Sequence, residues 1–259
     1  MHKIDKQFSR LVEIMSILRG ENGCPWDREQ SHKSLRQHLL EEAYEVIETI
    51  DKERYDELAG ELGDLLLQVV FHAQMASEEG RFDIHDVIQE INEKLIRRHP
   101  HVFGDAEINS AEEQVTHWEQ LKLTHEGKKS AIDGVPKQLP ALLRAFRMQK
   151  KASTVGFDWP DVEPVWHKVA EEFEELREAC TKSDEKKIEE EFGDLLFSLV
   201  NLSRFLKVNP EDALRMTIEK FYSRFRQVEQ EFGKQGKAMR GATLEEMDEV
   251  WDRIKKEET

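Results

Sequence analysis

Residues 171–175 read EEFEE, and residues 191–194 read EFGD. The same pattern occurs earlier in the chain, where EEAYE at residues 41–45 precedes ELGD at residues 61–64. The distance between the two motifs is identical in both copies, and the residues after each Gly-Asp pair are apolar in both. Agreement in spacing and in apolar context indicates that the chain contains an internal duplication.

Short motifs on either side extend the duplication. Ser110 and Thr243 each begin a capping-box pattern, and each is followed eight positions later by a tryptophan, Trp118 or Trp251. Between the copies, a stretch with two glycines and a proline has no hydrophobic period. We therefore expect domains at residues 1–126 and 136–259, joined by a linker at residues 127–135.

Within each half, apolar residues recur every three to four positions, as on one face of a helix. Leu39, Ala43, Val46 and Ile50 have this spacing in the first half, and Ile188, Phe192, Leu195 and Leu199 have it in the second. No alternating strand pattern is convincing. The sequence predicts an all-α protein built as two helical bundles, each with about four main helices.

The composition limits the classes of partner. Of 259 residues, 36% are charged and the net charge is −16, which argues against binding a nucleic-acid polymer. No segment is long and apolar enough for a membrane span or a signal peptide, so we expect a soluble cytoplasmic protein. The two cysteines, Cys24 and Cys180, have neither zinc-site nor disulfide-framework spacing.

The duplicated acidic motifs predict metal sites. Side chains three positions apart on a helix share a face, and a short connection makes successive helices antiparallel neighbours. Four carboxylates would then meet in each half, and a bound cation would offset their repulsion. Oxygen-only ligands favour Mg²⁺, with Mn²⁺ as a substitute. The candidate ligands are Glu172, Glu175, Glu191 and Asp194, and a second site would contain Glu42, Glu45, Glu61 and Asp64.

Two alternative functions compete with an interpretation in which these carboxylates form metal sites. His85-Asp86 raises the alternative of an HD-type metal phosphohydrolase, although it lies at an expected helix start, where Asp is favoured as a cap. A non-enzymatic helical scaffold with acidic binding faces is the second alternative. Identical carboxylate spacing in both halves argues against the scaffold.

Taken together, these motifs resemble those of the MazG nucleoside triphosphate pyrophosphohydrolases. The likeness includes NGCPWD at residues 22–27, ELGDLL at 61–66, RRHPHVF at 97–103 and VGFDW at 155–159. It implies tandem copies of the all-α NTP pyrophosphatase fold, a homodimer, and hydrolysis of nucleoside triphosphates to monophosphate and pyrophosphate. Broad substrate choice and a nucleotide-pool clean-up role follow from it. One motif carboxylate would act as general base, without the sequence indicating which.

The resemblance also assigns the site residues of the second half. Glu172, Glu175, Glu191 and Asp194 match its Mg²⁺ ligands, while Lys168, Lys220, Arg224 and Trp251 match nucleotide contacts. We add Glu171, Glu190 and Asn201 to the nucleotide-binding set.

Two differences between the halves point to the second one as catalytic. Asn201 and Lys168 can bind phosphate, whereas the matching residues of the first half, Phe71 and His38, are less suited to it. We expect the first half to serve mainly in dimerisation or regulation.

Overall fold

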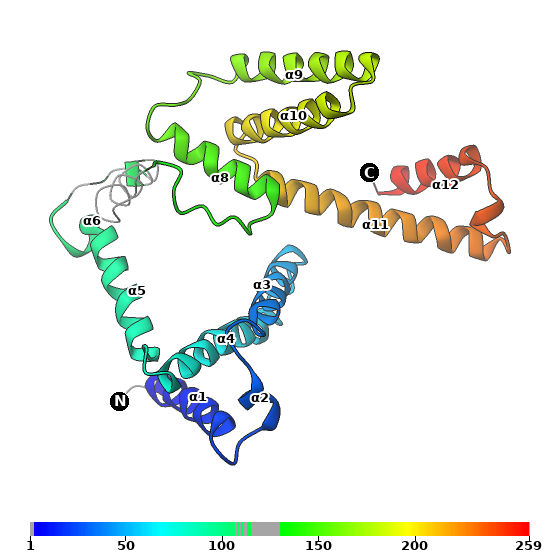
Figure 1. Cartoon of the computed structure of the whole chain (residues 1–259). Helices are drawn as coiled ribbons and strands as arrows, with labels where there is room; N and C mark the ends of the chain where they lie inside the picture. The colour runs from blue at the N-terminus through cyan, green and yellow to red at the C-terminus, as the bar shows by residue number, and fades with distance from the viewer. Residues whose placement is uncertain (1–2, 107, 109, 111–112, 115–129, 259) are drawn as a thin grey trace. The chain divides into compact units, whose positions relative to one another are not determined.

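The computed structural model describes residues 3–106, 108, 110, 113–114 and 130–258. These residues form helices and turns with no strand among them (Figure 1), which confirms the expected all-α fold. They divide into two compact units, Met1–Ile108 and Asn109–Thr259. The predicted linker at 127–135 lies partly outside the described residues, and Trp118 lies wholly outside them.

The N-terminal unit is assembled around one long helix, α4. Its helices are α1 (Lys3–Arg19), α2 (Pro25–Glu29), α3 (Arg36–Asp51), α4 (Leu58–Glu78), α5 (Ile84–Arg98) and α6 (Pro100–Phe103). Helices α1, α3 and α5 each pack against α4. Met15, Leu35, Val70, Phe71 and Met75 form the buried core where α1 and α4 meet.

The C-terminal unit contains the second acidic hairpin. Its helices are α8 (Ala141–Ser153), α9 (Glu163–Lys182), α10 (Glu185–Phe205), α11 (Pro210–Lys234) and α12 (Leu244–Glu257), with a 3-10 turn at Met239–Gly241. Helices α9 and α10 share the most extensive contact in the unit, and α8 packs against both α10 and α11. Helix α12 folds back onto α11 around buried Val228, Phe232, Val250 and Ile254.

Local sequence explains where these helices begin and end. Ser183 has a left-handed backbone with φ of 52°, which reverses the chain after α9. The Asp184 side chain accepts a hydrogen bond from the Lys187 backbone N–H and caps α10. The capping box predicted at Thr243 is confirmed, with Glu246 as its partner, and the Asn209 side chain caps α11.

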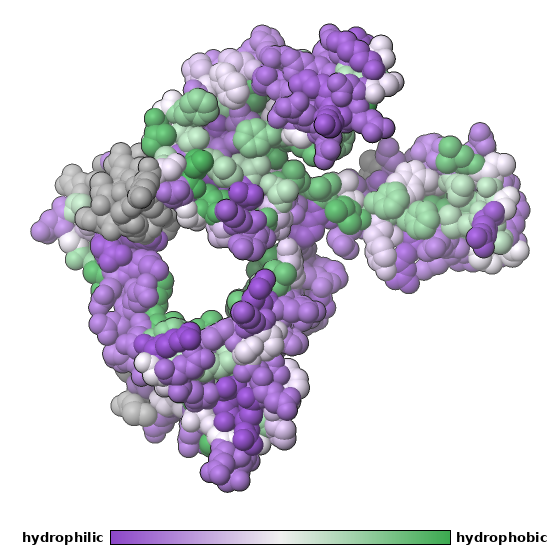
Figure 2. Space-filling view, viewed as in Figure 1, coloured by the Kyte–Doolittle hydropathy of each residue, from purple (hydrophilic) through white to green (hydrophobic). Residues whose placement is uncertain are grey.

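Part of each predicted apolar stripe remains at the surface. Phe192, Leu196 and Leu199 on α10 are 52%, 41% and 42% exposed, so the other described helices of the unit leave this side of α10 uncovered. Figure 2 shows hydrophobic residues at the surface of this unit. The apolar stripe of α10 is therefore only partly buried within the described part of the chain. None of the described helices combines the length and apolar composition needed to cross a membrane.

Candidate active site

The candidate site lies on the antiparallel hairpin of α9 and α10. Glu172 and Glu175 are three positions apart on α9, as are Glu191 and Asp194 on α10, so each pair projects from one face of its helix. Carboxylate oxygens of Glu172, Glu175 and Glu191 lie within 4.8 Å of one another. The predicted convergence of acidic side chains is thus present for these three residues.

Burial sets two of these carboxylates apart from ordinary surface acids. Glu172 is 6% exposed and Glu191 is 3% exposed, whereas Glu175 lies at the open side of the group. Charged carboxylates are rarely buried without a partner, because removing their hydration is unfavourable. The arrangement therefore requires nearby positive charge.

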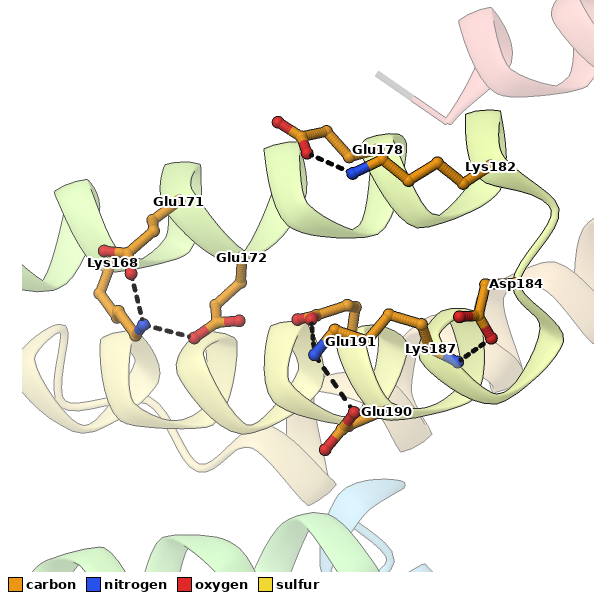
Figure 3. A network of polar contacts seen from close by, with 9 residues as sticks. All are labelled: Lys168, Glu171, Glu172, Glu178, Lys182, Asp184, Lys187, Glu190 and Glu191. Carbon is orange, nitrogen blue, oxygen red and sulfur yellow. Dashed lines mark hydrogen bonds and ion pairs between the residues drawn. The ribbon is translucent and has the colours of Figure 1, made fainter.

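Two lysines supply positive charge to the buried acids. Lys168 Nζ lies 2.8 Å from both Glu171 Oε1 and Glu172 Oε1. Lys187 Nζ lies 2.5 Å from Glu191 Oε1 and 3.2 Å from Glu190 Oε2. Figure 3 shows both lysines bridging acidic neighbours.

These contacts change the pKa values of the groups that form the site. Hydrogen bonds to Glu171 and Glu172 raise the pKa of Lys168 well above its usual range, and Glu191 and Glu190 do the same for Lys187. The pKa of Glu175 is also raised, first by loss of hydration and then by the charges of Glu191 and Glu172. The site therefore contains two firmly protonated lysines beside carboxylates that repel one another.

A cavity of about 570 Å³ opens beside the acidic hairpin. Four of the predicted site residues line it, namely Lys168, Glu172, Asp194 and Asn201. The wall continues onto α8 and onto residues 156–159 of the VGFDW segment, none of which was predicted as a site residue. Its size is typical of small-molecule sites, and a wall that combines charged and apolar side chains suits a nucleotide.

Three other predicted residues lie on α11 and α12 and do not line this cavity. The Arg224 guanidinium binds Glu258, with Nη2 2.6 Å from Oε2, and lies over the Trp251 ring at 5.9 Å. Trp251 also packs against Phe221, with ring centroids 5.4 Å apart. Lys220 is exposed on α11. Arg224 and Trp251 therefore contact each other, and their other contacts given above are with Glu258 and Phe221.

The N-terminal unit repeats the acidic cluster with a different electrostatic setting. Carboxylate oxygens of Glu42, Glu45 and Glu61 also lie within 4.8 Å of one another. Loss of hydration raises the pKa of Glu42, and the charges of Asp64, Glu45 and Glu61 raise it further.

Neither lysine of the second hairpin has a counterpart in the first. The positions that correspond to Lys168 and Lys187 hold His38 and Glu57, and Glu57 is itself bound to Arg54 at 2.6 Å. The first cluster therefore has carboxylates that could hold a cation. At the two positions that correspond to Lys168 and Lys187 it has no ammonium group that could bind phosphate.

Phe71 is a further difference between the two halves. It occupies the position that corresponds to Asn201, and it is 3% exposed within the core of Met15, Val70 and Met75. Asn201 instead lines the cavity of the second half. An apolar side chain packed into a core cannot bind a phosphate or a nucleoside, so this difference favours the C-terminal hairpin as the working site.

Sequence reasoning missed several residues of the site. Lys187 stands four positions before Glu191, as Lys168 stands four before Glu172, and this repeated spacing was a readable signal. Gln149 on α8 and Arg204 on α10 also line the cavity. No sequence pattern marked these two, because their place depends on how α8 packs against α10.

The rival metal cluster at the start of α5 has a structural explanation. Asp83, His85 and Asp86 offer ligand atoms within 4.8 Å of one another, but all three residues are exposed. Asp83 accepts hydrogen bonds from the backbone N–H groups of His85 and Asp86, while Asp86 accepts one from Asp83. These contacts form the capping box of α5, as the sequence indicated.

Comparison with known proteins agrees with this geometry. The family model described as the MazG nucleotide pyrophosphohydrolase domain matches residues 30–103 and 162–229, which include both acidic hairpins. A nucleoside triphosphate pyrophosphohydrolase/pyrophosphatase MazG of Thermotoga maritima is 52% identical, covering 96% of this chain and 95% of that protein. A nucleoside triphosphate pyrophosphohydrolase of Escherichia coli is 49% identical, covering 97% and 98%. An uncharacterised protein of Bacillus subtilis, YabN, is 46% identical over 97% of this chain but only 52% of its own length. The chain belongs to the MazG nucleotide pyrophosphohydrolase family.

Proposed function

We propose that this protein hydrolyses nucleoside triphosphates between the α- and β-phosphates, releasing a nucleoside monophosphate and pyrophosphate. The α9–α10 hairpin would carry the reaction. The observation that supports this most is the convergence of Glu172, Glu175 and Glu191 beside a cavity of nucleotide size. The names of the Thermotoga maritima and Escherichia coli relatives support the same reaction class.

The donor set of the hairpin fits a hard divalent cation. It offers carboxylate oxygens from Glu172, Glu175 and Glu191, with Asp194 close by on α10, and no nitrogen or sulfur ligand. Mg²⁺ is the cation that such a set would hold, and Mn²⁺ would substitute for it. Bound there, the ion would supply positive charge against the triphosphate and the buried acids.

Side chains of the hairpin would accept the proton and bind the phosphates during the reaction. A water molecule attacks the α-phosphorus, and its oxygen forms the new P–O bond. The bond from that phosphorus to the bridging oxygen breaks, and pyrophosphate leaves. One of the four carboxylates accepts the proton from that water. Lys168 and Lys187 would bind phosphate oxygens, and Glu171 and Glu190 would hold these lysines in place, as they do here.

A second copy of the chain would complete the assembly. Leu214, Ile218, Phe221 and Phe225 are 48%, 54%, 57% and 39% exposed, and their spacing places them along one face of α11. An apolar helix stripe of this kind suits a partner helix, so we propose a homodimer formed through it. Lys220, Arg224 and Trp251 lie on α11 and α12 beside this stripe, and we propose that they contact the nucleotide in the dimer.

The N-terminal unit would not hydrolyse nucleotides. It lacks both lysines, and buried Phe71 replaces the cavity-lining asparagine. We propose that it serves dimerisation or regulation, and that its acids Glu42, Glu45, Glu61 and Asp64 bind a cation without turnover. The proposed substrate range of the enzyme is broad, in keeping with a role in clearing unwanted nucleotides.

Product analysis tests the proposed reaction. The full-length protein is incubated with dGTP and either MgCl₂ or EDTA, and pyrophosphate and orthophosphate are measured separately. We expect pyrophosphate with Mg²⁺ only, and at least a hundredfold slower release by Glu172→Gln, which keeps the side-chain size but removes the charge. Glu178→Gln is the matched control, because Glu178 lies on the same helix and its side chain is 69% exposed. Orthophosphate as the product, or full activity of Glu172→Gln, would contradict the proposal.

A further inference from the structure

The cavity extends beyond the acidic hairpin, and much of its remaining wall is apolar. Lys168, Glu172 and Asp194 line the charged part, while Met148, Phe157 and Trp159 are among the residues that line the rest. The phosphates of a bound nucleotide would lie beside Lys168 and the proposed cation, next to the acidic hairpin. The nucleoside would then occupy the rest of the cavity, where several polar side chains stand among apolar ones and could distinguish one nucleoside from another. Two of these polar side chains, Asp158 and Arg204, bind each other.

Gln149 is one of those polar groups, and one of its atoms has no partner. It is 9% exposed, and its Nε2 donates a 2.9 Å hydrogen bond to the backbone oxygen of Phe197. That bond excludes a flipped amide, because a flip would place two oxygens against each other. Its Oε1 is buried and receives no hydrogen bond within the described part of the chain. A buried acceptor without a donor is unfavourable, so this atom is suited to a donor that arrives with a ligand.

Asn201, also on the cavity wall, offers a hydrogen-bond donor where Gln149 offers an acceptor. Its Oδ1 accepts hydrogen bonds from Arg204, at 3.2 Å from Nε and 2.9 Å from Nη2. Arg204 in turn binds both carboxylate oxygens of Asp158, at 2.8 and 2.5 Å. Because Arg204 occupies the amide oxygen, the Nδ2 group of Asn201 is the part left to donate to a ligand.

We infer that Gln149 and Asn201 together recognise the nucleoside of the substrate within this cavity. Gln149 Oε1 accepts a hydrogen bond from a base N–H or a sugar O–H, after a small rotation of its terminal amide, and Asn201 Nδ2 donates one. Arg204 and Asp158 are positioning residues that hold the Asn201 amide in its donating orientation. The inference rests on the proposed function, since it assigns the specificity of the same site.

Steady-state kinetics of Gln149→Leu test the role of the acceptor. Leucine preserves approximate volume and removes both amide atoms. KM for the preferred nucleotide should rise about tenfold, the effect of one lost hydrogen bond, while kcat stays within about twofold. Gln68→Leu is the matched control, because Gln68 is also a buried glutamine with an unpartnered Oε1 but lies in the N-terminal unit. KM of this control should not change.

Substrate analogues identify the donor without altering the protein. GTP is compared with ITP, and ATP with purine riboside triphosphate, to remove exocyclic amines. N1-methylguanosine and N3-methyluridine triphosphates remove ring N–H donors, and 2′-deoxy and 3′-deoxy nucleotides remove sugar hydroxyls. The analogue that lacks the contacted group should have a raised KM with wild-type protein and no further increase with Gln149→Leu. Equal KM values across the analogues for wild-type protein would overturn the inference even if Gln149→Leu failed to fold.

A double-substitution experiment tests the positioning pair. Arg204→Met should raise KM severalfold with little change in kcat, and it should add nothing in an Asn201→Ala background. A purely structural role would instead lower stability and activity in both backgrounds. Unchanged KM in Gln149→Leu and Arg204→Met would refute this inference alone, whereas wild-type protein that released no pyrophosphate would refute the proposed function.

Discussion

Replacing Glu191 with glutamine should leave the metal-free protein at least as stable as the wild type, because it relieves repulsion between buried acids. Oxygens of Glu191 and Glu172 lie within 4.8 Å of each other, and both residues are less than a tenth exposed. At an effective dielectric constant of about 20, two unit charges at this distance repel by about 3.5 kcal/mol. The nearby lysines offset part of this repulsion.

The same substitution weakens an attraction. Glu191 loses its charge-assisted contact with Lys187, whose side chain is 50% exposed. Ion pairs with such an exposed member contribute about 0–1 kcal/mol. Relief of repulsion therefore outweighs the lost pair, and we expect the unfolding temperature in EDTA to stay level or rise.

Added Mg²⁺ should reverse this order of stability. At a concentration one hundred times its dissociation constant, a ligand of the folded state stabilises it by about 2.7 kcal/mol. For a protein of this size that corresponds to about 5–11 °C in unfolding temperature. Glu191→Gln should lose most of this shift, because one of three converging carboxylates is gone.

Thermal unfolding with and without MgCl₂, together with hydrogen exchange of α9 and α10, measures both effects. Hydrogen exchange assigns the stabilisation to the C-terminal unit. Glu178→Gln, on the exposed side of α9, should keep the wild-type shift. A drop of several degrees for Glu191→Gln in EDTA would show that the lost ion pair outweighs the relieved repulsion. A full Mg²⁺ shift in that variant would show that Glu191 does not hold the cation.

Four further predictions concern the rest of the chain. Glu42→Gln should keep pyrophosphate release within about twofold of wild type, because the first hairpin lacks the lysines and the asparagine of the second; an activity loss near that of Glu172→Gln would contradict this. Asn201→Phe, which introduces the residue of the N-terminal unit, should lower kcat/KM about tenfold or more in the same assay, since about 1.4 kcal/mol of lost binding has that effect. Phe221→Asp should convert dimer to monomer in light-scattering chromatography, whereas Ser223→Asp, on the opposite face of α11, should not. The pKa of His72 is lowered from 6.5 by burial and by nearby His32, so the unfolded state binds the proton more tightly and stability should fall as pH drops below 6.5. His72→Leu should weaken that pH dependence in urea unfolding.

The helical class, the duplication and the acidic hairpin could be predicted because they depend on local periodicity. Glu172 and Glu175 share a face of α9 by their spacing alone, and the short turn at Ser183 makes α9 and α10 antiparallel neighbours. The repeated motif distinguished these acids from the many others in a chain of net charge −16. Features within one helix, or between helices joined by a short turn, are readable in this way.

Features that depend on packing between distant segments could not be predicted. Gln149 meets the Phe197 backbone across 48 positions, and Asp158 meets Arg204 across 46. Neither contact has a periodic signature. The exposed side of α10 also escaped prediction, because hydrophobic spacing shows which residues share a face and not whether the same chain covers it.

We propose that the carboxylates of the C-terminal hairpin jointly hold the cation that the reaction requires. Anomalous scattering from crystals of the full-length protein soaked with Mn²⁺ and a non-hydrolysable nucleoside triphosphate tests it directly. The predicted result is a Mn²⁺ peak about 2.0–2.3 Å from oxygens of Glu172 and Glu191, with the nucleotide phosphates adjacent. A nucleotide bound elsewhere, with cation peaks only at the N-terminal acids or at Asp83 and Asp86, would show that the C-terminal hairpin is not the cation site.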